Sequence, residues 1–454
     1  MVVPLLWSAL FTTALAVAYG PQSWPLVDLY GFFSDAQAHG WSETLAAAFG
    51  RGREYRPFHV LLVKLLYQVG GLNLWFYKTL VLLEFMAILA VLVWILRPAD
   101  RRQSVWALLA VCCVAGLPTS AILLGLLPGH SYALVTLLVL LSAAMALEPP
   151  MRAYGWVFLP VTLTALLLWA LGILAPAVVT ALWLARAPGV GRTGVGATWA
   201  AVAIYAGIRL SLGNQGDALQ FVDSGLGFTD RSRGELGELF DHAPYLFAMY
   251  NVAASALTVL FSEPRAGKFK FVESLLHGNT PFWLWWHLIS STITTVAIGS
   301  LFFLRKQFAT RDVQLVALGL ALMTGGSALG FLYTRDRISV LVGIGYAVLL
   351  YVALAALWKR GGSHLRGRFV IGLAIVVLAG MWTVRAAEMW LRVRDTAWET
   401  YVEWTDRYEF LGGTTRPQTL LLRQLRAAAL ANRPNDPRDD PDWTYLFFER
   451  GTAR

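Results

Sequence analysis

The chain carries at residues 73–96 the stretch NLWFYKTLVLLEFMAILAVLVWIL, in which only Lys78 and Glu84 are charged. As a helix it would be about 36 Å long, which exceeds the ~30 Å hydrocarbon core of a bilayer. Water is absent from that core, so a spanning segment must satisfy its own backbone hydrogen bonds, as a helix does. The stretch therefore predicts a membrane-spanning helix.

Comparable apolar runs recur along the whole chain, in which 57% of the 454 residues are hydrophobic and only 14% are charged. This composition predicts an all-α polytopic membrane protein. We expect about eleven transmembrane helices, near residues 3–19, 73–96, 104–119, 131–147, 155–171, 173–186, 196–212, 283–304, 313–333, 338–358 and 369–390. The first of these could instead be a cleaved signal peptide, although it has no basic residues before it.

The net charge of +9 comes largely from short loops between the apolar runs, which argues against a nucleic-acid partner. If the predicted spans alternate, thirteen Lys and Arg residues fall on one side of the membrane. Because cytoplasmic loops are enriched in Lys and Arg, this side is predicted to be cytoplasmic. The sequence thus predicts a multi-pass protein of the plasma (inner) membrane with a cytoplasmic N-terminus and an external C-terminal tail.

Residues 1–390 are accordingly predicted to form one transmembrane domain, with a first outer loop at 20–72 and a large outer loop at 213–282. Residues 391–454 have a soluble composition and form an outer-face tail. Two apolar stretches are left out of the span count. The stretch 58–69 is too short to span and is predicted to be an interfacial helix. The stretch 243–261 is predicted to be interfacial or re-entrant, since counting it as a span would move every later basic loop to the other side of the membrane.

Acidic and basic residues at the predicted outer side suggest a chemistry. Asp28 and Asp35 follow the first span, and a carboxylate in a partly desolvated cleft can act as a general base toward an acceptor hydroxyl. Arg56, Arg335 and Arg337 lie near spans on the same side, and a guanidinium suits bidentate phosphate binding. Both groups have plainer explanations: acids also serve to solvate a loop, and arginines often anchor helices at the interface.

Ionisable residues inside predicted spans are a second signal, because burying charge in the membrane is costly. Glu84 is predicted to be structural, and either to hydrogen-bond a neighbour in the bundle or to pair with Lys78, although a spacing of six residues is a poor match for one helix face. Lys78 is predicted to lie near the outer side, where it could reach a phosphate. Arg385 and Glu388 are expected to extend to the outer surface as an i,i+3 pair.

Three motifs carry a resemblance to a known family. They are Tyr55-Arg56-Pro57-Phe58, then Gly71-Leu72-Asn73-Leu74-Trp75-Phe76-Tyr77 at the start of a span, and Arg335-Asp336-Arg337-Ile338-Ser339 followed by Gly343 and Gly345. Together with the preceding acidic segment they resemble GT-C glycosyltransferases, in particular the branch of polyprenyl-phosphate-dependent O-mannosyltransferases with TPR repeats and its bacterial relatives. The chain departs from that pattern at Leu29, Lys78, Val81 and Ile338, which stand where the family has an acid, a His, an Asn and a Tyr.

The resemblance implies a GT-C-like bundle with juxtamembrane helices in the first outer loop. It also implies that Asp28, or failing that Asp35, activates the acceptor, while Arg56, Arg335 and Arg337 hold the phosphate of a polyprenyl-phosphate sugar donor. The sugar would pass with inversion to a protein, lipid or glycan acceptor. A polysaccharide polymerase or ligase and a non-enzymatic transporter or flippase are the alternatives.

The sequence supports no metal site. The seven histidines show no H-x-x-H or H-E-x-x-H spacing, although Asp28 or Asp35 could meet a distant acid such as Asp241 around a divalent ion. Cys112 and Cys113 are adjacent in an apolar run and form no CxxC pair.

Overall fold

The computed structural model describes residues 2–19, 26–50, 56–121, 123, 129–212, 232–265, 268–331, 339–361, 365–406, 420–434 and 436. These residues fold as helices, with a single isolated β-bridge between Arg265 and Lys268 and no strand in the described ranges. The fold is thus all-α, as predicted.

The helices of the first half are α1 (Val2–Tyr19), α2 (Leu26–Ala38), α3 (Trp41–Gly50), α4 (Pro57–Gly70), α5 (Leu74–Leu96), α6 (Arg101–Gly116), η1 (Pro118–Ala121), α8 (Gly129–Leu147), η2 (Pro149–Val157), α9 (Phe158–Leu168), η3 (Ala170–Ile173), α10 (Leu174–Leu184) and α11 (Arg192–Ser211). Those of the second half are α12 (Arg233–Leu239), α13 (Pro244–Leu260), α14 (Lys270–Leu276), α15 (Phe282–Gly299), α16 (Leu301–Leu304), η4 (Arg305–Gln307), α17 (Thr310–Ala328), α18 (Val340–Gly361), α19 (Leu365–Asp406) and α20 (Leu420–Ala431).

Each predicted span coincides with a helix, but fewer helices meet the requirements for crossing a membrane. Six are long and apolar enough: Leu74–Leu96, His130–Leu147, Pro149–Leu168, Phe282–Gln307, Val340–Gly361 and Gly367–Thr405. A seventh results if α12 and α13, which meet at an 85° bend, form one broken span or re-entrant loop. The chain is therefore consistent with a multi-pass membrane protein, and the count of about eleven spans is not confirmed.

The helix predicted at 155–171 ends early, at Leu168, where the chain turns back on the end of α9. Trp169 has extended backbone angles and closes α9, after which the chain forms the short η3. A Cβ atom at Gly172 would collide with the backbone of Ala165, so only glycine allows the chain to fold back this closely.

Local sequence explains where two of the central helices begin. Asn73 caps α5 by accepting hydrogen bonds from the backbone N–H groups of Trp75 and Phe76, and Asp100 caps α6 by accepting from Gln103 N at 2.7 Å. Such caps satisfy backbone donors that have no partner within the helix.

The core of the bundle is α18, in which every residue from Val340 to Ala356 is buried. It packs closely on α17 because Gly319 and Gly345 face each other: a Cβ at Gly345 would lie 2.6 Å from the carbonyl oxygen of Gly319. Cys112 and Cys113 of α6 are also buried in this core.

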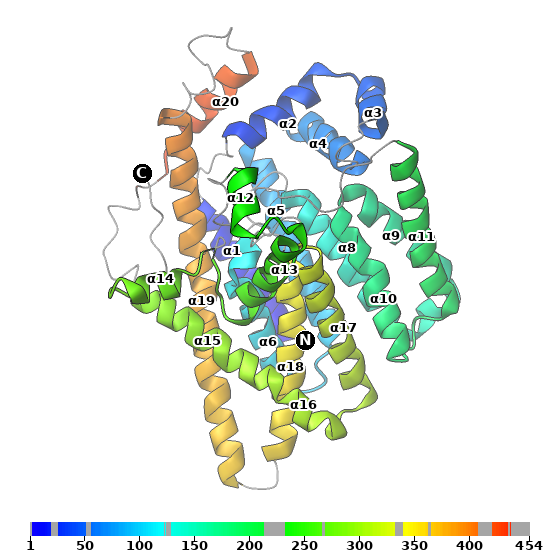
Figure 1. Ribbon diagram of the computed structural model, residues 1–454, viewed down its shortest axis with the longest axis vertical. Coiled ribbons are helices and arrows are strands. Elements are labelled where there is room, and N and C mark those ends of the chain that lie inside the picture. Colours follow the sequence, from blue (N-terminus) through cyan, green and yellow to red (C-terminus); the bar gives the residue numbers. More distant parts are fainter. Residues whose placement is uncertain are drawn as a thin grey trace.

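Figure 1 shows α2, α3 and α4 together at one end of the bundle, while α19 runs along its side from the opposite end to α20. At 1.5 Å per residue, the 42 residues of α19 extend about 63 Å. This helix continues beyond residue 390, where the sequence analysis placed the start of the tail, and packs against both α1 and α6.

Candidate functional site

The segment predicted to be the first outer loop forms three helices, α2, α3 and α4, that pack on one another and on the bundle. Pro57 occupies the first turn of α4, where its missing N–H is not needed, and this fixes the helix start directly after Arg56. Lys64, two turns further along α4, is 6% exposed and donates from Nζ to the carbonyl oxygens of Ala36 (2.5 Å) and His39 (2.6 Å). Because these carbonyls lie at the C-terminal end of α2, the ammonium group joins α2 to α4 and is favoured by the negative end of the helix dipole.

Asp35 lies in this assembly. Its side chain is exposed and lines a cavity of about 70 Å³ together with His39, Thr44 and Lys64. The carboxylate is open to solvent and lines the same cavity as the Lys64 side chain. Asp28 lies on α2, two turns earlier, but its side chain falls outside the described part of the structure.

Arg56 packs on an aromatic surface at the end of the bundle. Its guanidinium carbon lies 3.5 Å from the centre of the Trp169 ring, and the ring of His59 contacts the same tryptophan edge-on at 5.6 Å. Trp169 also contacts Tyr132 at 4.5 Å. The break of the helix after α9 thus presents Trp169 as a platform that orients Arg56, whose side chain stays half-buried.

His59 is buried beneath Arg56 and pairs with α8 through a 2.7 Å contact between Nδ1 and Ser131 Oγ. Burial, and secondarily the charge of Arg56, lower the pKa of His59 to about 4. The imidazole is therefore neutral at physiological pH, so Arg56 is the cation of this cluster.

This pKa predicts a pH-dependent stability. An unfolded histidine titrates near 6.5, so between pH 6.5 and 4 the unfolded chain binds more protons than the folded one, and stability falls as the pH falls. We expect acidification from pH 7 to pH 4 to remove roughly 2–3 kcal/mol through this residue. His59→Gln, which keeps a hydrogen-bonding side chain toward Ser131, should flatten the profile of thermal midpoint against pH in detergent. An unchanged profile would contradict a buried neutral imidazole.

Glu84 and Lys78 are buried residues of α5, the helix that follows α4. Glu84 Oε2 is 2.9 Å from His130 Nδ1, and both side chains are buried, so the predicted hydrogen bond of Glu84 to a neighbour is confirmed. The partner, however, is His130 rather than Lys78. Lys78 is 3% exposed, with its Nζ 4.9 Å from the ring centre of Trp75.

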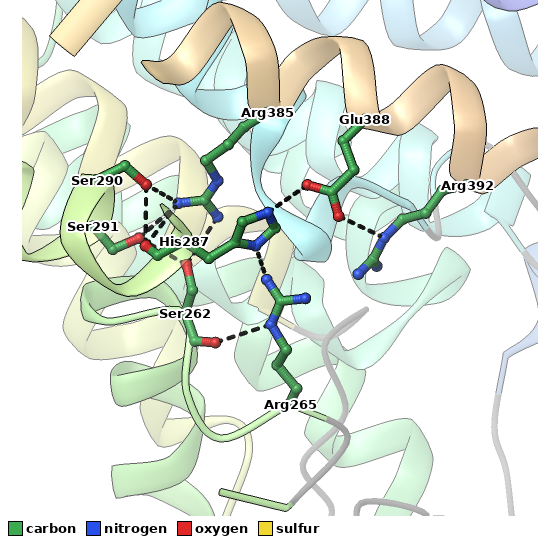
Figure 2. A network of polar contacts seen from close by, with 8 residues as sticks. All are labelled: Ser262, Arg265, His287, Ser290, Ser291, Arg385, Glu388 and Arg392. Carbon is green, nitrogen blue, oxygen red and sulfur yellow. Dashed lines mark hydrogen bonds and ion pairs between the residues drawn. The ribbon is translucent and has the colours of Figure 1, made fainter. Parts of the chain in front are cut away.

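A second polar cluster joins α15, α19 and the segment that follows α13; we call it the arginine network, and it comprises Ser262, Arg265, His287, Ser290, Ser291, Arg385, Glu388 and Arg392 (Figure 2). Arg385 is 1% exposed. Its Nη1 donates to the hydroxyls of Ser290 (2.9 Å) and Ser291 (2.8 Å), and its Nη2 donates to Ser262 (2.8 Å). The hydrogen bonds of Nη1 and Nη2 are therefore accepted by neutral oxygens.

A small residue on the facing helix brings Arg385 into the bundle. A Cβ atom at Gly116 would lie 2.9 Å from the Cβ of Arg385, so glycine at this position lets α6 and α19 meet backbone to backbone. The arginine side chain then leaves α19 toward α15, and its guanidinium carbon lies 4.2 Å from the Trp382 ring centre.

Glu388 carries the negative charge of the arginine network. Its Oε2 lies 2.6 Å from His287 Nε2 and its Oε1 lies 3.5 Å from Arg392 Nε. Arg265 Nη2 contacts the other ring nitrogen, Nδ1. Because a guanidinium can only donate, Nδ1 accepts, which places the imidazole proton on Nε2, the nitrogen that faces the Glu388 carboxylate.

Glu263 lies beside this network in the turn after α13. Burial raises the pKa of its carboxyl group to about 7, while Arg265 and the backbone N–H of Phe271, which donates to Oε1 at 3.3 Å, oppose that rise. The carboxyl group therefore changes charge near neutral pH, next to a network that contains three arginines.

The predicted site residues are thus placed unequally. Asp35 and Arg56 belong to the α2–α4 assembly and Lys78 is buried on α5, whereas Arg335 and Arg337 lie outside the described residues. The prediction that Arg385 and Glu388 extend to the outer surface is wrong, since both are buried and contact α15 rather than each other. His59, His130 and His287 were not singled out as partners; their only signal in the sequence is a polar side chain within or beside an apolar run.

No group of three or more His, Cys, Asp or Glu side chains within the described ranges is arranged to hold a metal ion. A scan against protein-family models gives no match, and a search of curated proteins gives none either.

Proposed function

We propose that the chain is an integral-membrane glycosyltransferase of GT-C type, which moves a sugar from a polyprenyl-phosphate donor to a protein, lipid or glycan acceptor at the outer face. The observation that supports this most directly is the α2–α4 assembly. It places Asp35 at a cavity and a half-exposed Arg56 on the same helical insert, directly after the first predicted span.

The proposed reaction is a single displacement. Asp28 or Asp35 accepts the proton of the acceptor hydroxyl as its oxygen attacks the anomeric carbon. The bond from that carbon to the phosphate oxygen breaks at the same time, and the electron pair leaves with the lipid phosphate. Arg56, with Arg335, Arg337 and Lys78 as further candidates, stabilises the charge on this leaving group. Attack opposite the leaving group inverts the anomeric configuration.

The same proposal includes the finer topology: about eleven spans, a cytoplasmic N-terminus, and an outer face that carries the α2–α4 assembly and the tail. The positive-inside distribution of Lys and Arg supports it. Five helices that are not among the six longest and most apolar ones would then also cross the membrane: α1, α6, α10, α11 and α17.

The test is transfer by the purified protein from a panel of labelled polyprenyl-phosphate sugars to peptide, lipid and glycan acceptors. We expect product from at least one donor, with inverted configuration. A folded protein that transfers no sugar from any of these donors would contradict the proposal. Retained configuration would contradict the single displacement.

Arg56 provides a prediction for donor binding. Arg56→Gln removes the charge and should raise the KM for the donor about tenfold, since a charge-assisted hydrogen bond to phosphate is worth about 1.5–3 kcal/mol. Arg56→Lys keeps the charge but loses the planar contact with Trp169, and we expect it to recover part of the affinity. If both variants keep the wild-type KM, Arg56 serves only to pack against Trp169.

A further inference from the structure

A basic cavity lies at the end of the bundle opposite the α2–α4 assembly. The helix α5 begins beside α4 and runs for 23 residues, about 34 Å, before Arg97 closes it. At that end the termini of α5, α10 and α18 meet the starts of α6 and α17 around a cavity of about 670 Å³. This volume is within the range of small-molecule sites in proteins. The site is distinct from the proposed sugar-transfer site.

The charges around the cavity are mainly positive. Arg97, Arg186, Arg311 and Lys359 line it, with Asp312 as the acidic lining residue. Two ion pairs neutralise part of this charge: Lys359 Nζ lies 3.1 Å from Asp312 Oδ2, and Arg97 Nη1 lies 3.0 Å from Glu148 Oε1.

The other two arginines take no part in these pairs. Arg311 Nη2 donates to the carbonyl oxygen of Ile95 at 2.6 Å, which is a neutral acceptor. Burial, and then the nearby charge of Arg97, lower the pKa of Arg311, against the smaller opposing effects of Glu148 and Tyr351, so the two guanidinium groups repel each other. Arg186 is exposed, and within the described part of the chain it enters neither ion pair. The cavity therefore has an excess of positive charge that an anion would neutralise.

Backbone conformation gives an independent argument for the same two positions. Arg97 caps the end of α5 and Arg186 follows Ala185, which caps the end of α10; their φ angles are 49° and 58°, in the left-handed region that favours glycine. A side chain in this region costs roughly 1–2 kcal/mol. Gln314 Nε2 donates to the carbonyl oxygen of Arg186 at 3.3 Å and helps to hold this conformation. An arginine at both helix ends, where glycine is easier, indicates that the two guanidinium groups are needed there.

We propose that this basic cavity binds the phosphate group of an anionic ligand, held by Arg97, Arg186 and Arg311. Guanidinium groups bind phosphate oxygens in a bidentate way, and basic pockets between membrane helices on the cytoplasmic side are suited to lipid head groups. The ligand is either an anionic phospholipid of the facing leaflet or a soluble phosphate compound.

The test measures binding to the full-length protein in a neutral detergent. Native mass spectrometry would be used to titrate a short-chain phosphatidylglycerol, a phosphatidylcholine of equal chain length, and inorganic diphosphate. We expect phosphatidylglycerol or diphosphate to bind, and phosphatidylcholine to bind at least tenfold more weakly.

The backbone angles allow variants that remove charge without straining the fold. Arg97→Gly and Arg186→Gly place glycine where the left-handed conformation favours it, so the thermal midpoint should stay equal or rise. Each should weaken phosphate binding at least tenfold. Arg186→Asn, which also tolerates this conformation, is a second variant should a glycine loosen the helix end. Arg360→Gln is the matched control, since Arg360 lies on the same helix end as Lys359 but does not line the cavity.

The outcomes separate the two sources of phosphate and can overturn the proposal. Binding of phosphatidylglycerol that diphosphate neither reproduces nor competes for assigns a lipid head group. Binding of diphosphate alone, lost in Arg186→Gly, assigns a soluble phosphate compound. If the glycine variants bind as the wild type does, or if Arg360→Gln weakens binding equally, the cavity is no phosphate site and the proposal fails. None of these results depends on sugar transfer.

Discussion

Glu388→Gln is expected to destabilise the protein by about 3–5 kcal/mol, because it removes one partner of a buried ionic group and leaves the others without a counter-charge. Glu388 is the carboxylate that His287 and Arg392 both contact in the arginine network, where Arg265 and Arg385 are buried as well. The neutral amide can replace one hydrogen bond but not the charge. Thermal unfolding in detergent, followed by tryptophan fluorescence, would measure the loss as a lower midpoint.

Arg392→Gln is the matched control for this variant. Its side chain is 28% exposed, and its Nε lies 3.5 Å from the same carboxylate, so water already solvates part of its charge. We expect a cost below about 1 kcal/mol, as for other partly exposed ion pairs. If Glu388→Gln were no less stable than Arg392→Gln, the buried carboxylate would not be what holds α15 to α19.

Loss of the general base is expected to have the largest effect on activity. Asp28→Asn or Asp35→Asn should lower kcat for sugar transfer by ~100-fold or more, since an amide cannot accept the proton of the acceptor hydroxyl. The donor KM should change little, because neither carboxylate is proposed to bind the phosphate. We expect one of the two substitutions to have this effect and the other to be nearly neutral, which would identify the base.

Glu43→Gln is the control carboxylate on the same insert. Its Oε2 accepts a hydrogen bond from Gly40 N at 2.9 Å at the start of α3, so its role is to cap that helix. The variant should retain transfer activity and lose at most about 1 kcal/mol of stability. If neither aspartate substitution lowers kcat further than Glu43→Gln does, the proposed base is wrong.

Local pattern predicted the helices well where a single apolar run determined them. The run at 73–96 forms α5 almost residue for residue, and the short stretch at 58–69 forms α4. Prediction was less exact where the path of the chain decides. The span predicted at 155–171 contains α9, which ends at Leu168, and the chain then turns so that Gly172 lies against Ala165. The stretch 243–261, predicted to be interfacial or re-entrant, forms α13, which meets α12 at an 85° bend that no periodicity encodes.

The candidate site shows the same limit. The sequence identifies Arg385 and Glu388 as costly charges, but only the packing of α6 on α19 at Gly116 determines that Arg385 faces the serines of α15. Likewise, Glu84 required a partner, and hydropathy alone could not select His130. Composition can locate a buried charge, whereas its partner depends on which helices become neighbours.

The two cysteines of α6 have a practical consequence. Cys112 and Cys113 are the only thiols of the chain, and they are 3% and 0% exposed. The folded protein should therefore react slowly with a membrane-impermeant maleimide, without any cysteine being removed. Single cysteines placed at the exposed positions Ala38 and Arg360 could then be labelled from one side of intact cells at a time. The labelling of each introduced cysteine would then show which compartment that end of the bundle faces, with Cys112 and Cys113 left in place.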